Sequence, residues 1–211
     1  MTSDTFGVEL YWLPLGAGGN FVRLNGRAYE AITATIQRRP RRDLYHSGLV
    51  VTVPDGRYTI EQTPAKPHGD QRGVVGIGPI GATWMARVPM FRYELRCWLD
   101  GVIPDVDEAV DSPQMLSHDA VAVRRLLELV PEVPFFIWGR DQLGVGEMWN
   151  SNSQISWLLA TAALDVDSIA PPSGGRAPGW NAGLVAAARH LSWRPESQTD
   201  IALGRVTSAG R

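Results

Sequence analysis

The sequence predicts an α+β fold: a central antiparallel sheet of four to six strands, with helices packed before and after it. Two observations support this prediction. Several short runs of alternating or β-branched residues lie in the first half of the 211-residue chain, and two of them flank Asp55-Gly56, a strong hairpin signal. Runs with apolar residues at helical spacing lie before and after this region. We interpret the whole as one α+β domain.

The N-terminal part of the chain predicts a strand followed by a helix. Residues 8–15 form an apolar run typical of a strand and lead into a glycine-rich turn. Residues 27–39 place Tyr29 and Ile36 at helical spacing, with arginines in the last turn, and Pro40 ends the pattern. This segment is therefore the first expected helix.

The middle of the chain supplies the other strands of the predicted sheet. A two-residue turn at Asp55-Gly56 is expected to set Val53 opposite Tyr58 and Val50 opposite Glu61. A glycine-rich stretch, residues 73–81, then leads to the last two strand candidates. The expected strands in this part are 44–53, 57–63, 83–88 and 91–99.

The second half of the chain is mainly helical. The expected helices are 117–130, a second that begins within the polar run Asn150-Ser151-Asn152-Ser153 and extends to Leu164, and 180–190. The sequence leaves open whether Ser151 or Ser153 begins the second helix. A proline- and glycine-rich stretch, residues 171–179, forms a loop between the last two helices. We interpret residues 1–195 as a single domain and residues 196–211 as a flexible C-terminal tail.

Composition and charge exclude several classes of function. The net charge of −2 gives no general attraction to nucleic acid, and no apolar stretch approaches the ~20 residues of a membrane span. The N-terminus lacks a signal-peptide pattern, so we expect a cytoplasmic protein without integral membrane contact. A single cysteine, Cys97, and four histidines without ligand spacing predict no metal and no cofactor. The oligomeric state is not indicated.

Two residues suited to nucleophilic catalysis stand out. Ser151 lies where a helix is expected to begin, so its hydroxyl is in the positive end field of that helix. His46 lies in a predicted strand and shares a face with Glu61, a carboxylate of the kind that orients a catalytic imidazole. A bulge in the hairpin would give that role to Gln62 instead. Ser153 competes with Ser151 as the nucleophile.

Other residues near this helix start are candidates for binding a substrate. Asn150, Asn152 and Gln142 offer donors that, with backbone N–H groups, suit an oxyanion site. Arg140 can hold a substrate carboxylate through two parallel hydrogen bonds. Trp149 is one of several tryptophans that can wall an apolar groove beside it.

Each of these residues also has a structural interpretation. The polar run Asn150-Ser151-Asn152-Ser153 before the helix is a typical capping cluster, whose side chains can satisfy the free N–H groups of the first turn. Arg140 and Asp141 can form an ordinary surface pair, and the tryptophans can fill the core. Cys97 lies in a strand pattern and is interpreted as a small buried apolar residue.

The order of these features resembles circularly permuted members of the NlpC/P60-like superfamily of papain-like proteins, including the lecithin:retinol acyltransferase-like and PPPDE peptidase branches. Asn150-Ser151-Asn152 matches the helix motif of those families, and Tyr45-His46-Ser47-Gly48 matches the strand that carries their histidine. The resemblance covers residues 44–164 and implies a papain-like fold. In those families the nucleophile is cysteine, whereas this chain has serine, which is a weaker nucleophile at neutral pH.

The resemblance implies one of two functions. In the first, the protein is a hydrolase or acyltransferase that acts on an amide or ester bond of a small-molecule, peptide or lipid substrate, with Ser151 as nucleophile, His46 as general base and Glu61 as orienting group. In the second, it is a catalytically inactive relative that binds a peptide, a lipid or a protein. Catalysis requires His46 within hydrogen-bond reach of Ser151 or Ser153.

Overall fold

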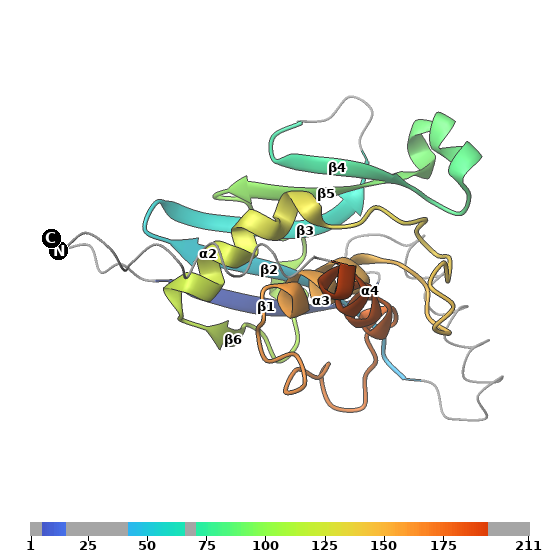
Figure 1. Ribbon diagram of the computed structural model, residues 1–211. Helices are drawn as coiled ribbons and strands as arrows, with labels where there is room; N and C mark the ends of the chain where they lie inside the picture. Colours follow the sequence, from blue (N-terminus) through green and yellow to red (C-terminus); the bar gives the residue numbers. More distant parts are fainter. Residues whose placement is uncertain (1–5, 16–41, 66–70, 194–211) are drawn as a thin grey trace, which may run out of the picture.

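The computed structural model describes residues 6–15, 42–65 and 71–193, which form one antiparallel sheet with helices on one of its faces (Figure 1). The order of strands across the sheet is β4-β5-β3-β2-β1-β6. The strands are β1 (Gly7–Pro14), β2 (Tyr45–Val53), β3 (Gly56–Pro64), β4 (Val74–Pro79), β5 (Arg92–Leu99) and β6 (Gln114–Ser117). The predicted α+β class and its antiparallel sheet are confirmed.

Three α-helices and four short 3-10 helices complete the described part of the chain. The α-helices are α2 (Ala120–Leu129), α3 (Ser151–Thr161) and α4 (Trp180–Trp193). The 3-10 helices are η1 (Thr83–Arg87), η2 (Pro89–Phe91), η3 (Val106–Glu108) and η4 (Val130–Glu132). In the described ranges no helix has the length and apolar character needed to cross a membrane. The predicted helix 27–39 and the predicted tail 196–211 lie outside these ranges.

The face of the sheet that the helices cover carries the main core. Trp12 of β1 and Leu49 of β2 are fully buried there, and Trp12 packs against Trp180 at the start of α4 with ring centroids 5.2 Å apart. Trp157 and Leu158 of α3 are buried in the same cluster. This burial of large apolar side chains is what holds the helices on the sheet, because it removes apolar surface from water.

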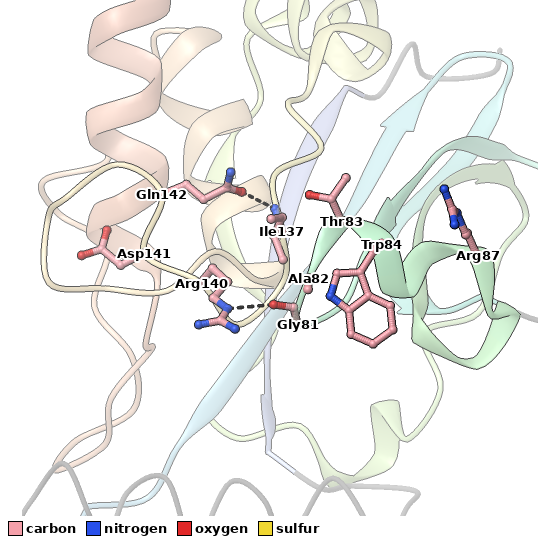
Figure 2. Close-up of a pocket in the computed structure, with 9 residues that line it drawn as sticks. All are labelled: Gly81, Ala82, Thr83, Trp84, Arg87, Ile137, Arg140, Asp141 and Gln142. Carbon is pink, nitrogen blue, oxygen red and sulfur yellow. Dashed lines mark hydrogen bonds between the residues drawn. The ribbon is translucent and has the colours of Figure 1, made fainter.

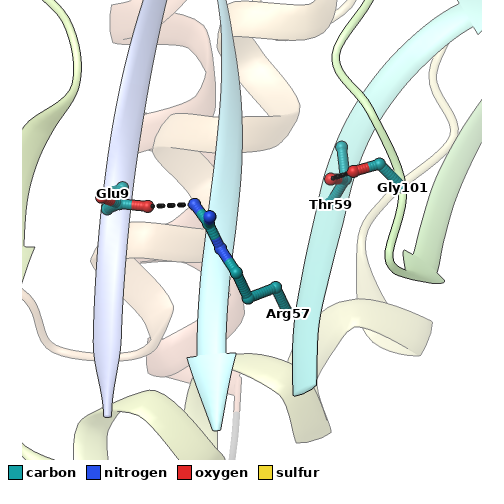
Figure 3. A network of polar contacts seen from close by, with 4 residues as sticks. All are labelled: Glu9, Arg57, Thr59 and Gly101. Atoms are coloured by element: carbon teal, nitrogen blue, oxygen red, sulfur yellow. Dashed lines mark hydrogen bonds and ion pairs between the residues drawn. The ribbon is translucent and has the colours of Figure 1, made fainter. Parts of the chain in front are cut away.

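The opposite face of the sheet is crossed by the chain that follows β5. Thr59 of β3 donates a hydrogen bond of 2.6 Å to the carbonyl oxygen of Gly101 (Figure 3). Ile103 then packs against Leu13 and Val50 in a second, smaller apolar cluster. The side chains of consecutive strand residues alternate between these two faces, so the register of each strand decides which residues can meet.

The β2–β3 hairpin has a register that differs by two residues from the predicted one. Val53 pairs with Gly56 and Val50 pairs with Thr59, so the turn consists of Pro54 and Asp55. The ring of Pro54 fixes φ near the value that the first turn position needs, which favours this turn over one at Asp55-Gly56. Because the difference is an even number of residues, the predicted faces of the two strands are unchanged.

The prediction of a strand at 83–88 was wrong: β4 occupies the preceding glycine-rich stretch, and the residues from Thr83 to Arg87 form η1. By its local preference alone, glycine in the interior of a strand weakens the strand. In β4, however, aromatic rings occupy the space that side chains would need, since a Cβ at Gly76 would lie 2.5 Å from Phe135 Cζ and one at Gly78 would overlap the Tyr93 ring. These tertiary contacts explain the misplaced strand.

Candidate functional site

The polar run before α3 forms a capping box. Asn150 is the N-cap residue: its side chain accepts a hydrogen bond of 3.3 Å from the Ser153 N–H, and the Ser153 hydroxyl accepts one of 3.1 Å from the Asn150 N–H. These two bonds satisfy donors that a helix start leaves free. The interpretation of the polar run as a capping cluster is therefore confirmed for Asn150 and Ser153.

Asn152 joins α3 to the sheet. Its side chain is buried, accepts a hydrogen bond of 2.8 Å from the Ser47 hydroxyl, and donates bonds of 2.9 Å to the carbonyl oxygens of Tyr45 and Pro178. Asn150 donates to the same Pro178 carbonyl at 2.8 Å. Two of the three predicted oxyanion-site amides, Asn150 and Asn152, are thus engaged with the protein itself, and buried polar groups need such partners.

Ser153 and the next serine along α3 hold the start of α4. The Ser153 hydroxyl is fully buried and donates to the carbonyl oxygen of Gly179 at 2.8 Å. The Ser156 hydroxyl donates to the carbonyl oxygen of Trp180 at 2.7 Å. The serine-rich sequence of α3 therefore serves the packing of α3 against α4, and Ser153 is not available as a nucleophile in this arrangement.

Ser151 is the first residue of α3 and is 9% exposed. Among the described residues its hydroxyl has no hydrogen-bond partner, whereas a serine nucleophile needs a base within hydrogen-bond reach. The helix start supplies a favourable field for an anion, but a field alone does not remove the hydroxyl proton at neutral pH.

His46 points to the opposite face of the sheet. It pairs with Leu13, which belongs to the apolar cluster under residues 100–108, whereas the next residue, Ser47, bonds to Asn152 on the helix face. Burial lowers the pKa of His46 from 6.5 to about 4, against the opposing effect of the Asp105 carboxylate. The imidazole is therefore neutral at pH 7, but the sheet separates it from α3.

Glu61 shares a face with His46, as the hairpin pattern predicts. Val50 pairs with Thr59, so residues 46 and 61 have the same parity in the ladder. Glu61 is 7% exposed and lies opposite Arg96 in the ladder between β3 and β5. Gln62, the other candidate orienting residue, pairs with Leu95 and points to the helix face. The structure therefore brings Glu61 and His46 to one face but does not bring Ser151 to either of them.

Arg140 and Gln142 line a hollow of about 850 Å³ on the surface, at the corner between β4 and the loop before α3 (Figure 2). Trp138 forms this corner, because it pairs with Ile80 on one side and with Trp149 on the other. The hollow is lined by Gly81, Ala82, Thr83, Trp84, Arg87, Ile137, Arg140, Asp141 and Gln142. We call the surface formed by residues 81–90 and 137–142 the Trp84 corner.

The polar side chains of the Trp84 corner are held in defined positions. Arg140 donates from Nε to the Gly81 carbonyl oxygen at 2.7 Å, and Gln142 accepts from the Ile137 N–H at 2.5 Å (Figure 2). Trp149, predicted to wall a groove, is 1% exposed and packs edge-on against Phe136 instead. Trp149 is thus part of the core behind the corner.

Sequence reasoning missed the apolar part of the Trp84 corner. Trp84 and Met90 are 70% and 72% exposed, and Val88 beside them is also exposed. Neither η1 nor η2 contains a buried residue. Trp84 and Val88 were predicted to lie in a strand, and Met90 fell between two predicted strands. No pattern in the sequence marks these residues as exposed, because exposure depends on what the rest of the chain covers.

In the described part of the chain, neither Cys97 nor a cluster of metal-binding side chains forms a second candidate centre. Cys97 lies half-buried against the main core, and burial raises the pKa of its thiol to about 11, which keeps it protonated at neutral pH. Among the residues described by the structure, no group of three His, Cys, Asp or Glu side chains is arranged to hold a metal ion.

Comparisons of this chain with protein-family models, with curated proteins and with solved structures give no match.

Proposed function

We propose that the protein is a binding module without Ser/His catalysis, and that it docks a partner protein through the Trp84 corner. The observation that carries the absence of catalysis is the placement of His46 and Ser151 on opposite faces of the sheet. Of the two functions that the resemblance implies, this placement favours the non-catalytic one. A papain-like origin of the fold stays a prediction.

The polar groups around Ser151 support the absence of catalysis. A general base must lie within about 2.6 to 3.2 Å of the proton that it removes. The side chains of Asn150, Asn152 and Ser153 hold α3 to β2 and to the start of α4, and each is bonded to a backbone or side-chain group of this chain. The segment that suggested an active site is accounted for by the assembly of the helix layer.

The Trp84 corner supports a binding function. Tryptophan, methionine and arginine are enriched at protein interfaces, where a few such residues supply most of the binding energy. Here Trp84, Met90, Arg87 and Arg140 lie on one exposed corner. Groups of large exposed apolar side chains are uncommon on monomeric proteins unless they take part in an interaction.

A fluorophosphonate probe tests the loss of catalysis, with intact mass as the readout. We expect no adduct on Ser151 under conditions that label a control serine hydrolase fully. Ser151→Ala and His46→Gln variants run alongside identify the site of any adduct. A single adduct on Ser151 that disappears in both variants would establish an activated serine and refute this part of the proposal.

Site-specific photo-cross-linking tests the docking surface. A photoreactive amino acid replaces Met90, and in a matched control it replaces Val121, which is 75% exposed on α2. In extract of the source cells we expect a discrete cross-linked product from position 90 but not from position 121, and its loss when Trp84→Ala is added. Equal products from both positions, or products unaffected by Trp84→Ala, would count against the corner as the docking surface.

A further inference from the structure

We infer that the Trp84 corner binds an acidic peptide segment in which carboxylates lie next to an aromatic or apolar side chain. This inference rests on the proposed function and adds the chemistry of the partner. It is drawn from the donors that line the hollow, from the charges around it and from the exposed indole of Trp84.

The hollow presents hydrogen-bond donors. The bond from Arg140 Nε to the Gly81 carbonyl oxygen leaves the two terminal nitrogens of the guanidinium as the group that faces a ligand (Figure 2). Gln142 uses its side-chain oxygen to accept from Ile137, so its amide NH₂ remains as a donor. Donors without matching acceptors select an anion, and a guanidinium fits a carboxylate through two parallel bonds.

The charges at the corner also favour an anion. Arg87 and Arg140 have no ion pair with any residue in the described ranges. Asp141 is the only acidic residue among those lining the hollow. Its carboxylate accepts from the N–H groups of Val145 and Gly146 at 3.0 and 2.8 Å. These bonds lower its pKa, and in Figure 2 the carboxylate points away from Trp84. Asp141 therefore serves its own loop.

The apolar surface explains why the ligand is a segment of several residues. The indole of Trp84 has no aromatic or cationic partner among the described residues and offers one face to a ligand side chain. Val88 and Met90 are exposed too, follow Trp84 closely in the chain, and lie outside the lining of the hollow. An extended acidic peptide spans both parts, whereas a small ion would use only the arginines.

Fluorescence anisotropy with labelled peptides tests the inference on the full chain. The probe is fluorescein-Gly-Glu-Asp-Phe-Glu-Asp-Leu-Gly. One comparison peptide has lysine at every acidic position, and the other has serine in place of the phenylalanine and leucine. We expect the probe to bind at least about tenfold more tightly than the lysine peptide and about fivefold more tightly than the serine peptide.

Variants then assign the binding to the corner. We expect Arg140→Glu and Trp84→Ala each to weaken probe binding about tenfold, and Arg140→Lys to weaken it about threefold because the planar guanidinium is lost. The matched controls are Arg124→Glu and Val121→Ser, at exposed positions on α2, and we expect these to leave probe binding unchanged. Urea unfolding of each variant shows whether it keeps the fold of the parent protein.

Each outcome either supports or overturns the inference. Equal binding of acidic and lysine peptides, or equal loss in corner and control variants, overturns it. If cross-linking from position 90 persists but the acidic probe does not bind, the chemistry assigned to the partner is wrong while the docking surface stands. If neither is observed, the proposed function fails as well. Self-association that Trp84→Ala abolishes, measured by sedimentation velocity, would assign the corner to a second copy of this chain and also overturn the inference.

Discussion

Ser47 of β2 and Asn152 of α3 are joined by a buried hydrogen bond of 2.8 Å, and this bond ties the helix layer to the centre of the sheet. The two residues are separated by 105 positions in the chain. They occupy the very motifs that suggested a catalytic histidine strand and a nucleophile helix. The bond shows that the two motifs do meet in space, with Ser47 rather than His46 at the contact.

Asn152→Ala should strongly destabilise the fold. The change removes three buried hydrogen bonds and leaves the Tyr45 carbonyl and the Ser47 hydroxyl without this partner. We expect the free energy of unfolding to fall by about 3 kcal/mol, because each net bond contributes about 1 kcal/mol and stranded buried groups add to the loss. Urea unfolding measures this. The neighbouring Ser151→Ala change is the control, with an expected effect within about 0.5 kcal/mol.

His46 should make stability depend on pH in the mildly acidic range. Its pKa is about 4 in the folded protein and 6.5 as a model value, so the unfolded chain binds more protons between these two pH values. The stability that depends on the neutral His46 imidazole is therefore fully present above about pH 6.5, and it is lost as the pH falls to about 4. The separation of the two pKa values corresponds to at most about 3 kcal/mol.

The measurement for His46 is the urea midpoint across this pH range for the parent protein and for His46→Gln. The variant should lose much of the dependence, whereas His118→Gln, at an exposed position, should keep it. Parallel curves for the parent protein and His46→Gln would show that the imidazole is not the group responsible.

Gly183→Ala should destabilise the contact between α3 and α4. A Cβ at this position would overlap the Ser153 carbonyl oxygen and the Ser156 hydroxyl, and the carbonyl cannot move without distorting α3. Overpacking of this kind costs about 1 to 3 kcal/mol, which outweighs a gain in helix propensity of up to about 1 kcal/mol. Thermal and urea unfolding measure the difference. Ala188→Ser, at an exposed position of α4, should change stability by less than about 0.5 kcal/mol, and a stabilised Gly183→Ala variant would contradict the close packing.

Arg96→Met should lower the free energy of unfolding, because it leaves the buried Glu94 carboxylate without its ion-pair partner. Arg96 and Glu94 form an ion pair of 2.5 Å with side chains 6% and 1% exposed. We expect a loss of about 3 to 5 kcal/mol, of which part returns in the double variant Glu94→Gln/Arg96→Met because the Glu94 carboxylate is then removed together with its partner. The exposed pair of Arg57 and Glu9 (Figure 3), joined at 2.9 Å, is the matched control. Arg57→Met should cost no more than about 1 kcal/mol.

Local patterns in the sequence predicted most of the sheet and the helix start. The runs at β1, β2, β3 and β5 have the apolar alternation that a half-buried strand needs, and all four strands are present. Asn150 and Ser153 cap α3 because capping depends on side chains within one turn of the backbone. The hairpin turn was predicted at Asp55-Gly56 but lies at Pro54-Asp55, because proline and glycine both favour turns and stand only two residues apart here.

The absence of a Ser/His pair could not be predicted from the sequence. It depends on which residues of β2 point to the side of the sheet where α3 lies. His46 and Ser47 are neighbours in sequence, yet only one of them can point to the helices, and no local pattern marks which. The sequence pattern also places Arg140 and Gln142 together in a loop. It does not show that η1 and η2 bring an exposed tryptophan and a second arginine beside them.

The sequence by itself determined the α+β class, four of the strands and the capped start of α3, because these depend on residues close together in the chain. Only the tertiary structure decided that Ser47 rather than His46 meets Asn152, that glycines at 76 and 78 form a strand, and that Trp84 stays exposed. These outcomes depend on contacts between distant segments, where packing selects one face or one strand from several that local preferences allow equally well.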